Sequence, residues 1–217
     1  MNRGKRLLPA FGMLAAVQMV AVSTVDGLTR PGYDETRNWI SQLSLGPNGW
    51  HGSVNLATCG LWLILCAVGL HRRVTGRTVV LILWCGLCFV ALALIRTDAG
   101  LGFPPGVPEE HTVRGLIHKL ISVTLGVAGI AAVAGVGPRR VARVVAAAMA
   151  VLFVAASVLV LLDDGEVLPG SPSGVFERAA LFAGLGWLGL CCTGLGRRAA
   201  GTGSVPAAQC GGRGLSG

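Results

Sequence analysis

The chain has 217 residues, of which 53 % are apolar and 13 % are charged, and its formal net charge is +8. Soluble domains carry about 25 % charged residues. The composition therefore excludes a water-exposed globular protein and indicates a membrane protein.

Six apolar runs follow one another along the chain, and each has at least 18 residues. A helix needs about 20 residues to cross roughly 30 Å of hydrocarbon. The runs therefore predict an all-α fold, a polytopic bundle of six transmembrane helices within residues 1–198. Residues 199–217 are mostly small or polar and predict a disordered cytoplasmic tail. The predicted helices cover about 7–25, 53–70, 78–95, 116–136, 144–162 and 179–196.

Basic and acidic residues alternate from one connection to the next. Twelve of the eighteen Lys and Arg residues precede the first run, separate the second from the third or the fourth from the fifth, or follow the sixth. None of the ten acids lies in those segments. The positive-inside rule then places both the N-terminus and the C-terminus in the cytoplasm. The sequence predicts a multi-pass protein of the cell membrane. A basic face beside anionic lipid explains the net charge, so no nucleic-acid partner is predicted.

The first external connection contains the stretch RPGYDETRNWISQLSLG, residues 30–46, which is rich in charged and aromatic residues. Pro31 and Gly32 predict a turn, and Asp34 is suited to cap a short helix that runs through Leu45. Trp39 would then lie at headgroup depth. Two interpretations remain open: the stretch rests in the interface as an anchor, or it closes a space between the helices as a lid.

Polar side chains are concentrated in the halves of the helices nearest the external connections. His51 and Asn55 share one face of the second helix, and Arg114 and His118 share one face of the fourth. Charges at membrane depth normally face a bundle interior or a wet cavity. The pattern predicts either a polar cup, open to the outer leaflet and apolar at its base, or an ion-pair network that joins the helix ends. The candidate ligand-binding residues are Asp34, Arg37, His51, Asn55, Arg96, Asp98, Arg114 and His118.

Two cysteines have a spacing found in redox and metal sites. Cys85 and Cys88 lie in the middle of the predicted third helix, without a nearby histidine. Small apolar packing residues are the better interpretation. No metal site and no cofactor are predicted.

Several short blocks together resemble one family. They are RPGYD with the following Arg-x-x-Ile-Ser-x-Leu, the TD that ends the third helix, RGLIH at the start of the fourth and GVFER before the sixth. These blocks are similar to the six-helix membrane proteins of the domain-of-unknown-function 998 family, over nearly the whole chain from Leu7 to Arg198. The resemblance implies the six-helix fold and a membrane location, but no established activity. Arg114 stands where that family commonly has a histidine, so the His-Gly-x-x-His pair is incomplete here.

Three hypotheses describe the function. The first is a protein that binds or moves a lipid or another hydrophobic small molecule in the cup. The second is a membrane-embedded enzyme, similar in general design to small terpene cyclases, that performs acid/base cyclisation or isomerisation of an isoprenoid-like substrate. Its catalytic residues would be Asp26, Asp164 and His118. The third is a structural or assembly partner in the membrane. The sequence contains no phosphate-binding loop, nucleophile elbow or zinc-protease helix, and it leaves the oligomeric state open.

Overall fold

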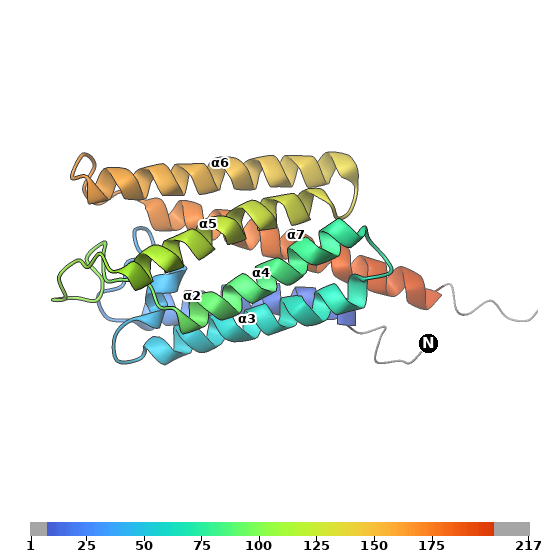
Figure 1. Ribbon diagram of the computed structural model, residues 1–217, viewed down its shortest axis with the longest axis horizontal. Helices are drawn as coiled ribbons and strands as arrows, with labels where there is room; N and C mark the ends of the chain where they lie inside the picture. Colours follow the sequence, from blue (N-terminus) through green and yellow to red (C-terminus); the bar gives the residue numbers. More distant parts are fainter. Residues whose placement is uncertain (1–7, 202–217) are drawn as a thin grey trace, which may run out of the picture.

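The computed structural model describes residues 8–201, with side chains described from Leu8 to Leu195. The predicted all-α fold is confirmed, because the only β-pairing in this part of the chain is one isolated bridge between Gly100 and Phe103. Two short 3-10 helices accompany six long helices. The elements in Figure 1 are η1 (Leu8–Ala10), α2 (Phe11–Thr29), η2 (Ile40–Ser44), α3 (Gly49–Leu70), α4 (Gly76–Leu94), α5 (Val113–Ala134), α6 (Arg139–Asp164) and α7 (Ser173–Gly201).

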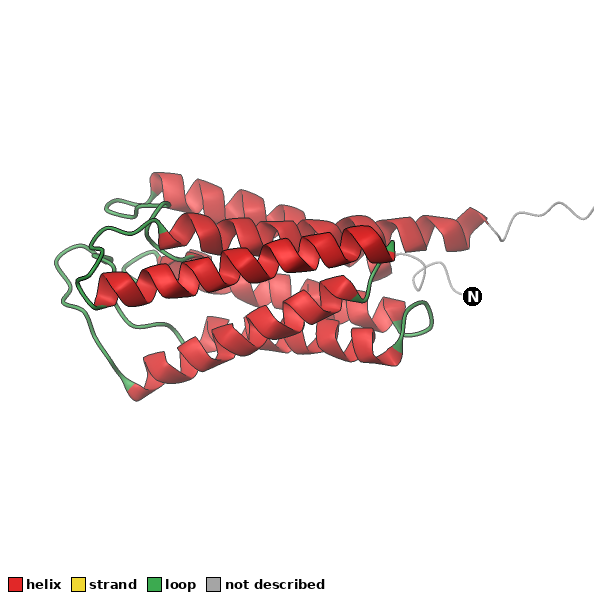
Figure 2. Ribbon diagram, turned by 90° about the horizontal axis from the view of Figure 1, so that it is seen from above, coloured by secondary structure: helices red, strands yellow, loops and turns green. Residues whose placement is uncertain are grey.

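All six long helices, α2 with η1 included, are long and apolar enough to cross a membrane. They form a closed ring: each helix packs against its neighbours in sequence, and α7 returns to pack against α2. Figure 2 shows the long connections, residues 30–48, 95–112 and 165–172, at one end of the bundle. The short turns 71–75 and 135–138 lie at the opposite end. We call these the loop end and the turn end.

Every long helix except α4 extends further at the loop end than the apolar runs predicted. α2 continues to Thr29 rather than residue 25, α5 begins at Val113 rather than 116, and α7 begins at Ser173 rather than 179. Capping explains one of these boundaries, because the Thr112 hydroxyl accepts a hydrogen bond from the Gly115 N–H at 3.0 Å. Hydropathy reports only the part of a helix that lies in lipid, whereas the helix itself ends where its backbone finds other partners.

The tail prediction is tested only at its beginning. α7 continues to Gly201, so residues 199–201 are helical and the predicted tail begins too early. Residues 202–217 lie outside the described part of the chain.

Small residues allow close approach of the helices. A Cβ on Gly60 of α3 would lie 2.5 Å from the Gly86 carbonyl oxygen of α4, so these two backbones are in direct contact. Such contacts are typical of membrane helices, where packing replaces the hydrophobic effect as the main attraction. Cys85 and Cys88 are both buried, and no disulfide joins the cysteines of the described residues.

Candidate functional site

Residues 30–48 cover the loop end. Two arginine side chains hold this segment in place, and the first is Arg30. Arg30 is only 8 % exposed and forms an ion pair with Asp26 of α2 at 2.7 Å. The same guanidinium donates hydrogen bonds to the carbonyl groups of Leu43 and Asn48, at 3.2 and 2.9 Å. One buried side chain thus fastens both ends of the segment to α2.

The second anchor is Arg178 of α7, the helix that packs beside α2 in the ring. Its guanidinium donates to the carbonyl groups of Glu35 and Asn38 at 2.8 and 2.7 Å, and also to the Tyr33 hydroxyl. Burial raises the pKa of the Tyr33 hydroxyl above its usual value, against the opposing effect of Arg178, so this phenol stays neutral. The segment is therefore held to the bundle by a network of charge-assisted hydrogen bonds.

Side chains of the segment complete its attachment. Trp39 donates from Nε1 to the Ser173 hydroxyl at 3.1 Å, and Arg37 forms an ion pair with Asp163 at 3.2 Å. Gln42 donates to the Gly100 carbonyl at 2.6 Å. The predicted helix through Leu45 is wrong, because the segment consists mainly of turns with one 3-10 helix, η2. Backbone groups that a regular helix would use internally are here occupied by Arg30 and Arg178.

A cavity of about 880 Å³, counting its open part, lies in the middle of the ring. Every long helix except α2 contributes to its wall, and Trp39, Ile40 and Ser41 line it from the covering segment. The lining is almost entirely apolar, and Glu177 is its only charged residue. We call this cavity the inner chamber. Its other lining residues are Leu56, Leu63, Cys85, Phe89, Leu92, Ser122, Leu125, Gly126, Gly129, Ile130, Val133, Met149, Phe153, Ala180, Leu181, Gly184, Leu185 and Leu188.

A second cavity, of about 1050 Å³ with its open part, adjoins the chamber at the loop end. It lies between α5, α6 and the connection 95–112, and we call it the loop-end pocket. The two cavities share the lining residues Trp39, Ser41, Ser122 and Phe153. The charged residues and histidines of the pocket are Asp98, Glu109, Glu110, His111, His118, Lys119 and Asp164. Two adjacent cavities result, and the one nearer the loop end contains most of the charged side chains.

Three of the predicted site residues meet in this pocket. His118 is 2 % exposed, and its Nδ1 lies 2.5 Å from the Ile95 carbonyl oxygen. Because a carbonyl only accepts, Nδ1 carries the proton, and the buried Nε2, which has no partner in the described chain, is left as a free acceptor. Asp164 lies across the pocket, with an oxygen 4.0 Å from Lys119 Nζ. The His118 imidazole and the Asp164 carboxyl are suited to hydrogen bonding with a ligand and to proton transfer.

Asp98 is the third predicted site residue that lines the loop-end pocket. Burial raises the pKa of the Asp98 carboxyl, but hydrogen bonds from the Thr112 hydroxyl and N–H, at 2.6 and 2.7 Å, outweigh that effect and bring the pKa below its usual value. Asp98 is therefore ionised at neutral pH and fixes the start of α5.

The other predicted site residues lie elsewhere. Asp26 belongs to the Arg30 ion pair, with His51 3.8 Å away, and Asn55 bonds to Gln18 of α2. Asp34 is exposed and accepts from Thr36; these bonds lower the pKa of Asp34. Arg37 pairs with Asp163, while Arg96 and Arg114 are exposed. The structure thus separates the predicted cluster into a helix–helix contact, an anchored loop and a pocket.

Sequence reasoning missed the residue that gives the chamber its only charge. Glu177 lies one turn inside α7 and accepts a hydrogen bond from the Ile40 N–H at 2.8 Å. The signal was its position, four residues after the start of an apolar helix, where acids are rare and normally face an interior. The predicted start at residue 179 placed Glu177 outside the helix, and this hid the signal.

The described residues contain no group of three His, Cys, Asp or Glu side chains placed to hold a metal ion. The chemistry available is that of hydrogen bonds, ion pairs and one apolar chamber.

Comparison with known protein families gives one match. A family model described as "Protein of unknown function (DUF998)" matches residues 13–194, and the chain therefore belongs to this family. Neither the curated proteins nor the solved structures gave a match.

Proposed function

We propose that this DUF998 protein binds a lipid or another hydrophobic small molecule, with the apolar part in the inner chamber and the polar part in the loop-end pocket. The observation that supports this is that the two cavities are adjacent and share the lining residues Trp39, Ser41, Ser122 and Phe153. Ligand sites typically have mostly apolar walls and a few polar groups that fix orientation. An amphipathic molecule matches this distribution of polarity.

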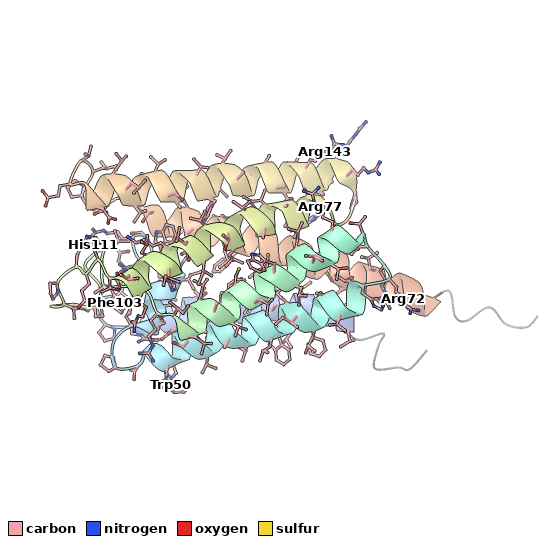
Figure 3. All side chains as sticks on the ribbon, in the orientation of Figure 1. Trp50, Arg72, Arg77, Phe103, His111 and Arg143 are labelled. Carbon is pink, nitrogen blue, oxygen red and sulfur yellow. The ribbon has the colours of Figure 1, made fainter. Side chains whose placement is uncertain are left out.

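We also propose that the loop end faces the outside of the cell membrane, so that the ligand enters from the outer leaflet. The basic residues Arg72, Arg77 and Arg143 lie at the turn end, and His111 and Phe103 lie at the loop end (Figure 3). Basic residues are concentrated on the cytoplasmic side of membrane proteins. Both chain termini would then be cytoplasmic.

Acid/base catalysis on the same ligand is the second candidate, and the observation that favours it is the presence of His118 and Asp164 in one pocket. Asp26 is not part of this proposal, because its carboxylate is committed to Arg30. For an enzyme, Asp164→Asn should leave the ligand bound and stop its conversion, since an amide retains the shape but is not a usable acid.

Photolabelling tests the binding proposal. The probe is a 16-carbon alcohol with a diazirine at mid-chain, added to the protein in nanodiscs of phosphatidylcholine. We expect labelled peptides to include chamber residues such as Phe89 and Met149, in addition to lipid-facing residues such as Val151. Labelling confined to lipid-facing residues would contradict the proposal.

Two glycine variants provide the matched comparison. Gly129 lies at the centre of the α5 face that lines the chamber, and no heavy atom of another element lies within 4 Å of the place where its Cβ would be. Gly129→Leu should therefore fill the chamber without a clash and abolish chamber labelling. Gly186 of α7 has the same free space but does not line either cavity. Gly186→Leu should leave the labelling unchanged, and an equal effect of both variants would count against the chamber as the site.

A further inference from the structure

Glu177 is unusual because a carboxylate lines a chamber that contains no basic side chain. Its Oε2 accepts the Ile40 N–H at 2.8 Å, whereas its Oε1 receives no hydrogen bond from any described residue. An ionised carboxylate without a counter-ion is costly in such surroundings. The carboxyl avoids this cost either by taking up a proton or by pairing with a cation, and such a cation would have to come from within the chamber.

The neighbouring arginine does not provide that partner. Arg178 turns its guanidinium into the covering segment, where it donates to the carbonyl groups of Glu35, Asn38 and Gly174 and to the Tyr33 hydroxyl. No ion pair within 4.0 Å joins Glu177 to a basic residue of the described chain. The field of Arg178 offsets part of the negative charge, but its donors are used elsewhere.

The loop-end pocket beside the chamber is also lined mainly by acidic side chains. Four acids line the loop-end pocket, namely Asp98, Glu109, Glu110 and Asp164, against one lysine, Lys119, and two histidines. Trp39 lines both cavities, so an aromatic ring is part of both walls. Acids and aromatic rings both attract cations, and a rim of one sign raises the local concentration of oppositely charged molecules.

We propose that the ligand is a hydrophobic cation, an amine or quaternary ammonium with an apolar body, and that Glu177 pairs with its positive charge. This inference rests on the proposed binding function and adds the chemical class of the ligand. The apolar wall of the chamber holds the body of the molecule, and the Glu177 carboxylate takes the place of the water that the cation loses on entry.

The test compares three probes that share the same diazirine-bearing 16-carbon chain. Their head groups are trimethylammonium, hydroxyl and sulfonate, and labelling is measured in phosphatidylcholine nanodiscs relative to the lipid-facing Val151. Relative to Val151, the ammonium probe should label chamber residues at least about tenfold more than the sulfonate probe, because the Glu177 carboxylate attracts the quaternary cation and repels the sulfonate. Because wild-type protein is used, this comparison does not depend on whether any variant folds.

Variants then assign the preference to one carboxylate. Glu177→Gln keeps an oxygen for the Ile40 N–H, so it should fold, retain labelling by the alcohol and lose the preference for ammonium. Glu177→Asp, which keeps the charge, should retain much of the preference. Glu166→Gln removes the same charge from the exposed connection 165–172 and should change nothing.

The outcomes separate the two proposals. Chamber labelling by the alcohol without any preference for ammonium would overturn the cation inference and leave the binding function standing. Preference that persists in Glu177→Gln would overturn the role of Glu177. Absence of chamber labelling by all three probes would overturn the binding function itself.

Discussion

Two contacts between neighbouring helices, α2 with α3 and α5 with α6, contain similar polar residues but use them differently. Between α2 and α3, Gln18 donates to Asn55 Oδ1 at 3.1 Å and accepts from Trp62 Nε1 at 2.6 Å. Between α5 and α6, Ser122 and Ser157 bond only to carbonyl groups of their own helices, and the loop-end pocket lies between them. A polar side chain at membrane depth seals a contact when it reaches the next helix, and lines a cavity when it does not.

Accessibility to a small water-soluble reagent should show the largest difference between the two contacts. Asn55 is 3 % exposed, whereas Ser157 lines the loop-end pocket. With Cys191 and Cys210 replaced by serine, Ser157→Cys should react with an impermeant methanethiosulfonate added outside cells, and Asn55→Cys should not. Equal reactivity would mean that the α2–α3 contact is open as well.

The same assay tests the orientation of the protein. Glu109→Cys at the loop end should react from outside, and Arg140→Cys at the turn end should react only after the membrane is permeabilised. The reverse pattern would place the pocket on the cytoplasmic side and overturn entry from the outer leaflet.

Stability should distinguish the two aspartates that sequence reasoning grouped together. Asp26 is 11 % exposed and pairs with Arg30 at 2.7 Å, so Asp26→Ala leaves a buried guanidinium without its counter-ion. Such a loss costs about 3–5 kcal/mol of unfolding free energy. Asp164 is 30 % exposed and lies 4.0 Å from Lys119, so Asp164→Ala should cost no more than about 1 kcal/mol.

Unfolding in mixed micelles of a mild detergent and dodecyl sulfate measures both values. Similar losses for the two variants would show that the pocket depends on Asp164 for its structure, and would remove Asp164 from the candidates for ligand binding or catalysis.

The fold could be predicted well from the sequence, because the thickness of a bilayer sets a minimum length for each apolar run. All six helices lie where the runs placed them, with ends displaced by several residues at both ends of the bundle. α7 shows the limit of the method: its first turn, residues 173–177, contains Ser173, Gly174 and Glu177 and was assigned to a loop. That displacement of one turn is why Glu177 did not enter the predicted site.

The candidate site could be predicted only in part, because helical spacing defines a face of one helix but not the neighbour that the face meets. Helical spacing supported Asn55 and His118 equally as candidate site residues. In the structure Asn55 meets Gln18 of α2, whereas His118 lies in a pocket formed with the connection 95–112. The polar cup that the sequence predicted stays a prediction; the described residues form two adjacent cavities, and most of their lining comes from apolar residues that no motif distinguishes.

The smallest expected effect concerns the hydrogen bonds that seal α2 against α3. Gln18→Leu keeps a similar volume but removes the contacts to Asn55, Thr58 and Trp62. Interhelical hydrogen bonds in membranes contribute about 0.6–2 kcal/mol each, and some of the freed groups find partners on their own helix, as Thr58 already does with the Val54 carbonyl. We therefore expect a loss of about 1–3 kcal/mol of unfolding free energy.

Ser157→Ala is the matched control for Gln18→Leu, because its hydroxyl bonds only to the Phe153 carbonyl of the same helix, at 2.8 Å. It should change stability by less than about 0.5 kcal/mol. Neither variant touches Glu177, so the preference of chamber labelling for the ammonium probe should survive in both. If Gln18→Leu were as stable as the wild type and reduced labelling, the polar groups of α2 and α3 would belong to the ligand site, and the distinction between a sealing contact and a binding contact would fail.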